Sequence, residues 1–509
     1  MIADIRSEMD NQSSGAPVTA DERAGDSPAD CDLLIIGGGI NGTAIARAAA
    51  ASGRRVILIE QGDLAQATSS ASTKLMHGGL RYLEYHEFGL VHESLTERGI
   101  MLKMAPHLVH PLEFRIIYGK DMRPWPILRL GLWLYDALAW RGGLPRSRSI
   151  RLNDDALKNG HGRGLSYWDA WVDDARLVVA NALDAESMDA TIFIRTRFTG
   201  AERGQDRWTV RTDGPYGPRS FSAGIIVNAA GPWAEAVLKQ GLAIRSGSRL
   251  RLVRGSHIVV RRCFAGDHAW LLQQPDGRIV FAIPYQQDFT LIGTTDAPVD
   301  DPADAHISEQ ERDYLLAAVN CYRREPLAAK DIVHSFAGIR GLHDDGAGSA
   351  SAVSRDYHLE LDEAGPPLLS IFGGKITTAR HLADDALARL GIKGGDTRHR
   401  PLPGGDFAEM AELFRVARKR WPFLDDATLK RMARAYGTRM IRVMGDAKTR
   451  EDMGRDFGAG LFAREVDYLI AEEWARSAED ILWRRSKFGL RLSVSQVDSL
   501  RDYIGERLG

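Results

Sequence analysis

The sequence predicts an α/β protein in which a Rossmann-type dinucleotide-binding domain carries an inserted antiparallel-sheet domain and is followed by a C-terminal α-helical domain. Three observations lead to this prediction. A glycine-rich turn stands between an apolar strand and a helix near the N-terminus, β-type patterning fills the middle of the chain, and residues from 406 onward are helical and charged in pattern. The 509 residues exceed what one hydrophobic core normally holds, so two or three domains are expected.

The glycine-rich turn is the most informative element. Residues 33–36 form an apolar run that suits a buried strand, and Gly37, Gly39 and Gly42 follow on the G-x-G-x-x-G spacing that opens a helix. Gly37 permits the tight turn, Gly39 lets a diphosphate approach the backbone, and Gly42 lets the helix lie close to the sheet. Such a motif alone is often only a loop. Here Glu60 ends the next strand about 20 residues later, where it can bind a ribose, so the full fingerprint of a dinucleotide site is present.

Composition excludes several other classes of protein. The formal net charge of -2 provides no overall field that would attract nucleic acid. Cys31, Cys263 and Cys321 are scattered without metal-ligand spacing, so neither a disulfide framework nor a metal site is expected. Residues 1–30 are polar and lack the apolar core of a signal peptide, which predicts a disordered tail and a cytoplasmic protein.

A second signature follows the first nucleotide motif. Residues 67–84 place small hydroxyl side chains before a lysine and a Gly-Gly pair, a composition that would by itself suit a solvated loop equally well. Beside a dinucleotide motif, this stretch resembles the second flavin signature of the glycine oxidase and D-amino-acid oxidase superfamily, most closely that of the FAD-dependent glycerol-3-phosphate dehydrogenases. The resemblance implies non-covalent FAD, contacted by Thr68, Ser69, Ser72, Lys74, His77, Gly78 and Gly79.

Further stretches support the resemblance, which covers nearly the whole chain from residue 31. Residues 171–177 resemble a sequence motif of the same family, and Asp173 is expected to cap a helix there. The strand that begins at residue 225 ends in a turn where Gly231 would approach the FAD. Residues 368–378 predict a strand, a glycine turn and a helix start, and the helix dipole would favour negative charge on the flavin. The residues implied at this turn are Gly373, Gly374 and Lys375.

The middle of the chain predicts the inserted sheet. Residues 255–260, 278–285 and 289–296 have strand patterns, and the last two are joined by a turn at 286–288. Together they suggest an antiparallel sheet that holds substrate above the flavin. We therefore expect a discontinuous FAD-binding domain with an interleaved substrate domain over residues 31–400, and a separate helical domain over 401–509.

The family resemblance implies a reaction and a substrate site. It implies oxidation of sn-glycerol 3-phosphate to dihydroxyacetone phosphate, which needs a hydride acceptor, a base for the hydroxyl proton and cations for the phosphate. His257 is the expected base, because it can be neutral near pH 7 and still accept a proton. A structural core histidine and surface arginines remain alternatives. The implied substrate residues are Arg81, Tyr82, His257, Arg340 and Lys375, of which His257, Arg340 and Lys375 are also expected to be catalytic.

The electron acceptor and the partners also come from the resemblance. It implies a membrane quinone, and an oxidase that uses oxygen is the alternative within enzymes. A non-catalytic flavin protein associated with RNA is the alternative outside them, but the balanced charge argues against nucleic acid. The resemblance leaves a homodimer open.

An enzyme that reduces a quinone must reach the bilayer. The sequence has no uninterrupted apolar segment of the roughly 20 residues that a spanning helix needs, so we expect peripheral binding to the anionic inner face of the cell membrane. Residues 123–141 mix Trp and Tyr with leucines between basic ends, as interfacial helices do, and residues 483–488 form a second basic and aromatic run. The alternative is that residues 123–141 belong to the core of the substrate domain.

Overall fold

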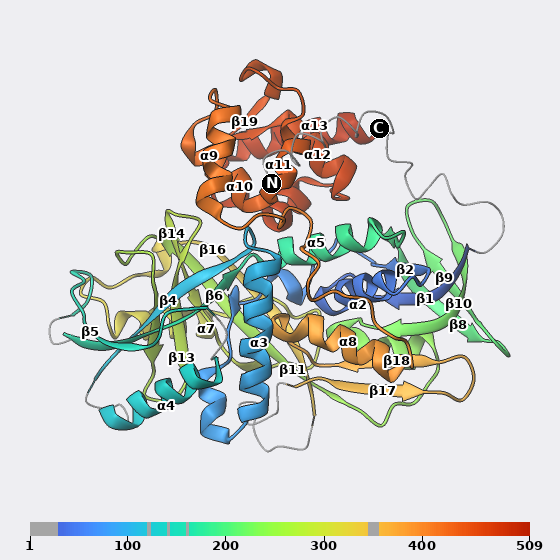
Figure 1. The fold of residues 1–509 in the computed structure, drawn as a ribbon, viewed down its shortest axis with the longest axis horizontal. Helices are drawn as coiled ribbons and strands as arrows, with labels where there is room; N and C mark the ends of the chain where they lie inside the picture. The colour runs from blue at the N-terminus through green and yellow to red at the C-terminus, as the bar shows by residue number, and fades with distance from the viewer. Residues whose placement is uncertain (1–28, 120–123, 140–142, 159–161, 345–355) are drawn as a thin grey trace.

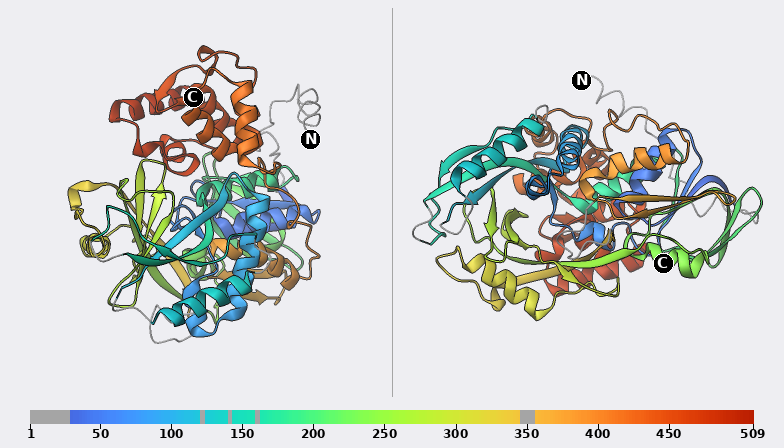
Figure 2. Two further views of the ribbon diagram at one scale, coloured as in Figure 1. Left: turned by 60° about the vertical axis from the view of Figure 1, so that its left-hand side comes forward. Right: turned by 90° about the horizontal axis from the view of Figure 1, so that it is seen from below.

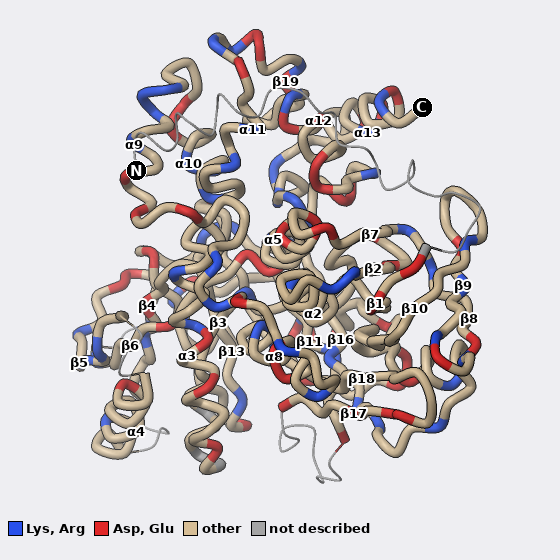
Figure 3. Tube along the Cα trace, turned by 45° about the vertical axis from the view of Figure 1, so that its right-hand side comes forward, with Lys and Arg blue, Asp and Glu red and all other residues tan. Residues whose placement is uncertain are grey.

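The computed structural model describes residues 29–119, 124–139, 143–158, 162–344 and 356–509. Figure 1 shows three parts: a sheet with helices α2, α5 and α8, a second sheet beside it, and a helical C-terminal domain resting on both. Lys and Arg are interspersed with Asp and Glu along the fold (Figure 3), in keeping with the small net charge. The predicted fold class is confirmed.

The first sheet is the predicted Rossmann-type sheet, with a strand order of β17-β18-β10-β1-β2-β7. Its inner strands are parallel, because each apolar strand returns through a helix or a longer excursion. β17 and the β8–β9 hairpin join it in antiparallel fashion. The first strand already includes Ala29 and Asp30, which the sequence analysis assigned to the N-terminal tail. The strands are β1 (Ala29–Ile36), β2 (Val56–Ile59), β7 (Thr191–Phe193), β8 (Arg197–Arg203), β9 (Trp208–Asp213), β10 (Arg219–Asn228), β17 (His358–Asp362) and β18 (Leu368–Phe372).

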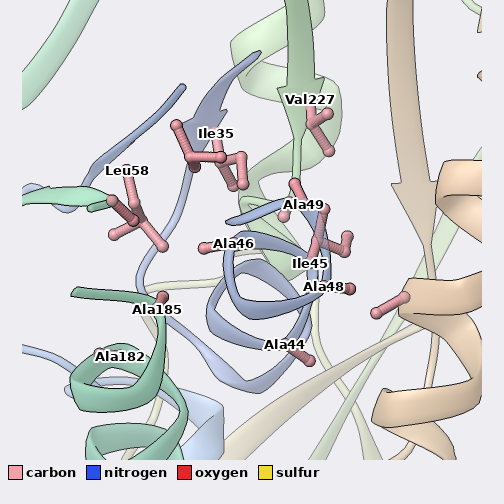
Figure 4. Packing of buried hydrophobic residues seen from close by; sticks show 14 of the residues in the cluster. Ile35, Ala44, Ile45, Ala46, Ala48, Ala49, Leu58, Ala182, Ala185 and Val227 are labelled. Carbon is pink, nitrogen blue, oxygen red and sulfur yellow. The ribbon is translucent and has the colours of Figure 1, made fainter. Parts of the chain in front are cut away.

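Helix α2 (Ile40–Ala51) lies between α5 (Asp174–Glu186) and α8 (Ala379–Arg389) and covers one face of this sheet. Its alanines make the close packing possible. Ala46 and Ala49 are fully buried in one cluster with Ile35 of β1 and Ala185 of α5, as Figure 4 shows. The predicted cap of α5 is confirmed, because the Asp173 side chain accepts a hydrogen bond from Arg176 N at 3.3 Å.

The second sheet follows the order β15-β11-β14-β13-β12-β4-β6-β3, with β16 on β11 and β5 on β6. It is antiparallel as predicted, except for the parallel pair β4 and β12. The predicted turn at 286–288 joins β13 to β14. The strands are β3 (Leu75–Met76), β4 (Val109–Ile117), β5 (Arg148–Arg151), β6 (Arg163–Val172), β11 (Leu250–Arg261), β12 (Ala269–Gln273), β13 (Ile279–Tyr285), β14 (Phe289–Gly293), β15 (Ala297–Pro298) and β16 (Ile332–His343), and the helices packed around them are α3 (Phe88–Met104), α4 (Trp125–Leu138) and α7 (Glu309–Asn320).

The C-terminal domain has its own buried core of apolar side chains and one short hairpin. It docks on α5, where Arg176 forms a buried ion pair with Glu473 and donates at 2.9 Å to Ala435 O. In the left view of Figure 2 this domain lies above the two sheets. Its elements are α9 (Met410–Arg420), α10 (Asp426–Tyr436), α11 (Met440–Met444), β19 (Asp456–Gly458), β20 (Leu461–Phe462), α12 (Ala463–Glu472), the π-helix η10 (Asp480–Arg485) and α13 (Val494–Leu508).

The buried ion pair between Arg176 and Glu473 should stabilise the docking of this domain on α5. We expect Glu473→Gln to lower the melting temperature by several degrees, because breaking a buried pair costs about 3–5 kcal/mol. Glu412→Gln is the control, since Glu412 pairs with Arg415 on an exposed helix face where such pairs contribute about 0–1 kcal/mol. Thermal unfolding followed by circular dichroism measures both. Equal melting temperatures for the two variants would contradict the docking role.

Candidate active site

The glycine turn has the tight geometry that its spacing predicts. Gly37 has a φ of +115°, and a Cβ there would lie 2.5 Å from Ala229 O. A Cβ on Gly42 would collide with Gly37 O, so α2 can approach the turn only because residue 42 is glycine. At the start of α2, Ile40 N donates to Ser69 Oγ at 3.0 Å. The turn therefore fits the close approach of a diphosphate to the helix N-terminus.

Glu60 braces this turn. Its two carboxylate oxygens accept hydrogen bonds from Gly38 N and Gly62 N, each at 2.7 Å. Burial raises the pKa of this carboxyl group, and the two backbone N–H bonds oppose that rise. Each oxygen has a second lone pair, so the carboxylate can still accept a ribose hydroxyl.

The stretch 67–79 runs between the two sheets, and its first residues face the nucleotide side. Thr68 Oγ1 donates to Ile339 O of β16 at 2.6 Å, and Ser69 meets α2 as described. Ser72 Oγ donates to Asp174 Oδ2 at 2.7 Å. The fully buried Lys74 Nζ donates to both oxygens of Asp174 at 2.8 Å. The side chains of Ser72 and Lys74 thus tie the stretch to α5.

The Gly-Gly turn is held by a buried network that the sequence analysis missed. Gly78 N donates to the Tyr135 hydroxyl at 2.8 Å, and that hydroxyl donates to Asp169 at 2.8 Å. Asp169 also pairs with Arg98, while burial raises the pKa of the Asp169 carboxyl to about 6. Beside this turn, the rings of His77 and Phe281 lie 6.5 Å apart. The network fixes the turn from three elements: α3, α4 and β6.

The predicted substrate residues fall into two groups. Lys375 and Tyr82 form the first, with Lys375 Nζ 4.3 Å from the centre of the Tyr82 ring. Arg81 lies in the same short helix, but its side chain is outside the described residues. The implied cofactor glycines Gly373 and Gly374 precede Lys375 and lie against the start of α2: Gly373 O accepts from Asn41 Nδ2 at 3.2 Å, and a Cβ on Gly374 would lie 2.9 Å from Asn41 Nδ2. A Cβ on Gly231, after β10, would meet open space.

Arg340 and His257 form the second group, on one face of the paired strands β16 and β11. Arg340 Nη1 donates to Asp296 Oδ1 at 2.7 Å and Nη2 to Thr295 O at 2.8 Å. A Cβ on Gly255 would overlap the guanidinium, so this glycine makes room for it. Arg340 is therefore an oriented, half-buried group, unlike the surface arginine that was the alternative.

His257 is buried in this face. Its Nε2 lies 3.0 Å from Thr73 Oγ1, and its ring stacks on Phe336 at 4.9 Å. Burial, and then the charges of Lys74 and Arg340, lower the pKa of His257 well below its usual value. The imidazole is therefore neutral at pH 7 and can accept a proton, but the lowered pKa makes it a weaker base than a free histidine.

Helix α4, within the predicted membrane segment, has two apolar faces. Ile127, Leu130 and Trp133 are 53%, 63% and 61% exposed, whereas Leu132 and Tyr135 are only 1% exposed. Tyr135 was expected among the interfacial aromatics, and this expectation is wrong because its hydroxyl is needed inside the core. The ends of the segment, residues 123 and 140–141, lie outside the described residues. Among the described helices, none is long and apolar enough to cross a membrane.

The second predicted membrane run, residues 483–488, is not a surface patch. Arg485 is fully buried against Asp63, Phe488 is buried, and the Trp483 ring stacks on His334 at 4.0 Å. The basic side chains of this run pair with acids of the first domain. The prediction was wrong because basic and aromatic residues also occur together at buried interfaces between domains. The sequence pattern alone does not distinguish such an interface from a lipid-binding surface.

Comparison with known proteins identifies the relatives of this chain. Residues 32–380 match the family described as FAD dependent oxidoreductase, and residues 395–506 match the C-terminal domain of alpha-glycerophosphate oxidase. Glycerol-3-phosphate dehydrogenase of Pseudomonas aeruginosa is 48% identical, over 93% of this chain and 94% of that protein. The aerobic glycerol-3-phosphate dehydrogenase of Escherichia coli is 43% identical over 93% and 97%. D-erythritol 1-phosphate dehydrogenase of Brucella abortus is 46% identical over 92% and 96%.

Solved structures show the same fold. The glycerol-3-phosphate dehydrogenase of Bacillus halodurans complexed with FAD has a TM-score of 0.72 and 26% identity, covering 94% of this chain and 90% of that one. The L-alpha-glycerophosphate oxidase of Mycoplasma pneumoniae with FAD bound has a TM-score of 0.58 and 18% identity, covering 74% of this chain and 98% of that one. The second likeness shows the fold alone.

Arg340 provides the sharpest test of the site. Arg340→Lys keeps the charge but loses the planar fork, so we expect kcat/KM to fall by about 30- to 1000-fold, or roughly 2–4 kcal/mol, with near-normal flavin content. Arg151→Lys on the exposed strand β5 of the same sheet is the control and should leave the rate unchanged. Steady-state kinetics with a dye acceptor measures both. An Arg340→Lys enzyme with wild-type kinetics would place this residue outside the substrate site.

Proposed function

Because this chain belongs to the family of FAD-dependent oxidoreductases, we propose that it oxidises sn-glycerol 3-phosphate to dihydroxyacetone phosphate. Its cofactor is FAD. The observation that carries the proposal is that an oriented cation, Arg340, and a buried neutral imidazole, His257, lie on the same face of the second sheet. A phosphorylated secondary alcohol needs both: a cation for its phosphate and an acceptor for its hydroxyl proton.

The residues of the nucleotide site fit the cofactor. Gly37 and Gly42 leave the helix N-terminus accessible to the diphosphate, and Glu60 keeps lone pairs for the ribose. When bound, FAD supplies the acceptor for the hydride that leaves the carbinol carbon. The non-covalent attachment that the family resemblance implies is part of this proposal.

The substrate would be held and deprotonated by residues of this chain. Arg340 presents its guanidinium fork with Asp296 and Thr295 O fixing its plane, which suits a phosphate or the developing alkoxide. Lys375 adds a second cation beside the Tyr82 ring. His257 accepts the hydroxyl proton, and Thr73 Oγ1 at its Nε2 holds the ring in place.

A four-carbon substrate is the second candidate. It is favoured by the 46% identity with the D-erythritol 1-phosphate dehydrogenase of Brucella abortus, which is close to the 48% identity with the Pseudomonas aeruginosa glycerol-3-phosphate dehydrogenase. Both substrates are polyol phosphates and would use the same cation and base. We propose the three-carbon substrate because two of these three relatives are named for it.

For the electron acceptor, we propose a membrane quinone rather than oxygen. The exposed face of α4, made by Ile127, Leu130 and Trp133, supports binding to the surface of a bilayer, since large apolar side chains are seldom so exposed together. Within α4 the one basic residue is Arg129, which is partly buried, so the membrane contact of the helix would be mainly apolar. The proposed location is the inner face of the cell membrane.

Anaerobic titration tests the substrate assignment. Glycerol 3-phosphate should bleach the flavin absorbance stoichiometrically, D-erythritol 1-phosphate should do so more slowly, and unphosphorylated glycerol should have no effect, because it offers no dianion to Arg340 and Lys375. Faster bleaching by D-erythritol 1-phosphate would transfer the assignment to the four-carbon substrate. Failure of both phosphates would reject the proposal.

Liposome sedimentation tests the membrane surface. Leu130→Glu with Trp133→Glu should lose binding to anionic vesicles and reduction of quinone, while dye-linked activity is retained, because only the exposed face of α4 changes. Val494→Glu, at a side chain 78% exposed on the C-terminal domain, is the control and should sediment normally. If the double variant still sediments with vesicles, the protein binds membranes through another surface.

A further inference from the structure

The loop at residues 60–66 forms the second wall of the nucleotide turn. Ala65 N donates to Gly38 O at 3.1 Å, and Leu64 is fully buried beside Gly38. Gly62 N donates to Glu60 Oε1 at 2.7 Å, while the other oxygen of Glu60 holds Gly38 N. The position of this loop therefore sets the position of both the ribose carboxylate and the glycine turn.

The C-terminal domain holds this loop through a buried ion pair. Asp63 and Arg485 are both fully buried, and Arg485 donates to the two oxygens of Asp63 at 2.7 and 2.6 Å. Arg484 contacts the same carboxylate. Arg485 is itself fixed from behind, since its Nε donates to Glu473 O at 3.0 Å. A bidentate pair of this kind is directional, so the loop is held in one position.

A second anchor reaches the same loop. Arg195 N donates to Gly62 O at 2.8 Å, and Thr196 N donates to Glu60 O at 2.7 Å. The side chain of the same Arg195 donates to Asp480 of η10 at 2.9 Å, and Asp480 is buried. The first and last residues of the π-helix η10 thus both hold the loop: Asp480 through Arg195, and Arg485 through Asp63.

We propose that the C-terminal domain is a working part of the FAD site, in which Arg485 and Asp63 are positioning residues that hold loop 60–66 ready for the adenosine end of the cofactor. Neither residue need touch FAD, since the effect passes through Gly62, Glu60 and Gly38. The inference depends on FAD binding and is independent of the substrate. It gives a role to a domain that otherwise only packs beside the site.

The test measures FAD binding to the flavin-free protein by quenching of flavin fluorescence. Asp63→Asn and Arg485→Lys should raise the Kd for FAD by about 10- to 100-fold. Loss of a residue that positions a ligand-binding group typically weakens ligand binding by this amount. Glu465→Gln is the matched control: it breaks a buried pair with Arg431 inside the same domain, away from Asp63 and Arg485, so its Kd should stay within about threefold.

Hydrogen exchange of the flavin-free protein gives a local measurement. Peptides that cover residues 60–66 should exchange faster in Asp63→Asn and Arg485→Lys, and not in Glu465→Gln. Arg195→Gln is the variant to use if the buried substitutions prevent folding. The Arg195 side chain is partly exposed, and replacing it removes only the second anchor. It should show the same increases in Kd and in exchange. Unchanged FAD affinity and unchanged loop exchange in the folded variants, or equal changes in Glu465→Gln, would overturn the proposal.

Discussion

The buried ion pair between Lys74 and Asp174 holds together the parts that form the site. Both side chains are almost completely inaccessible, so neither charge can be satisfied by water, and separating them would leave an uncompensated charge in the core. The pair fixes residues 72–74 against α5. Thr73 consequently reaches His257 on the second sheet, while Ser69, a few residues earlier, reaches the start of α2 on the first. One segment thereby sets the distance between the cofactor cradle and the substrate face.

The second sheet holds the proposed substrate residues on a rigid surface. Arg340 and His257 are on adjacent paired strands, and Gly255 leaves the space that the guanidinium occupies. Groups held on strands keep their orientation better than groups on loops, which is what binding of a phosphate dianion and transfer of a proton both require. The C-terminal domain contributes from the other side, through Arg485 and Asp63, by fixing the loop beside the nucleotide turn.

The sequence was informative where the physical cause is local. The glycine turn, the cap at Asp173 and the strand pattern of the second sheet depend on neighbouring residues, and the structure has each of them. Tyr135 and Arg485 were misread because their roles depend on distant partners. Arg485 meets Asp63 across 422 positions of the chain, and Tyr135 meets Gly78 only once α4 has packed on the sheet. Burial of one face of an apolar helix is a tertiary property that periodicity does not reveal.

We propose that oxidation takes place at the carbinol carbon next to the phosphate-bearing carbon, with Arg340 holding the phosphate and His257 taking the hydroxyl proton. The most direct measurement is the rate of anaerobic flavin reduction, by rapid mixing, with glycerol 3-phosphate carrying deuterium at C2. We expect this label to slow the reduction clearly, whereas deuterium at C1 should leave the rate unchanged. A rate that is insensitive to the C2 label but slowed by deuterium at C1 would show that another carbon is oxidised, and would contradict the proposal.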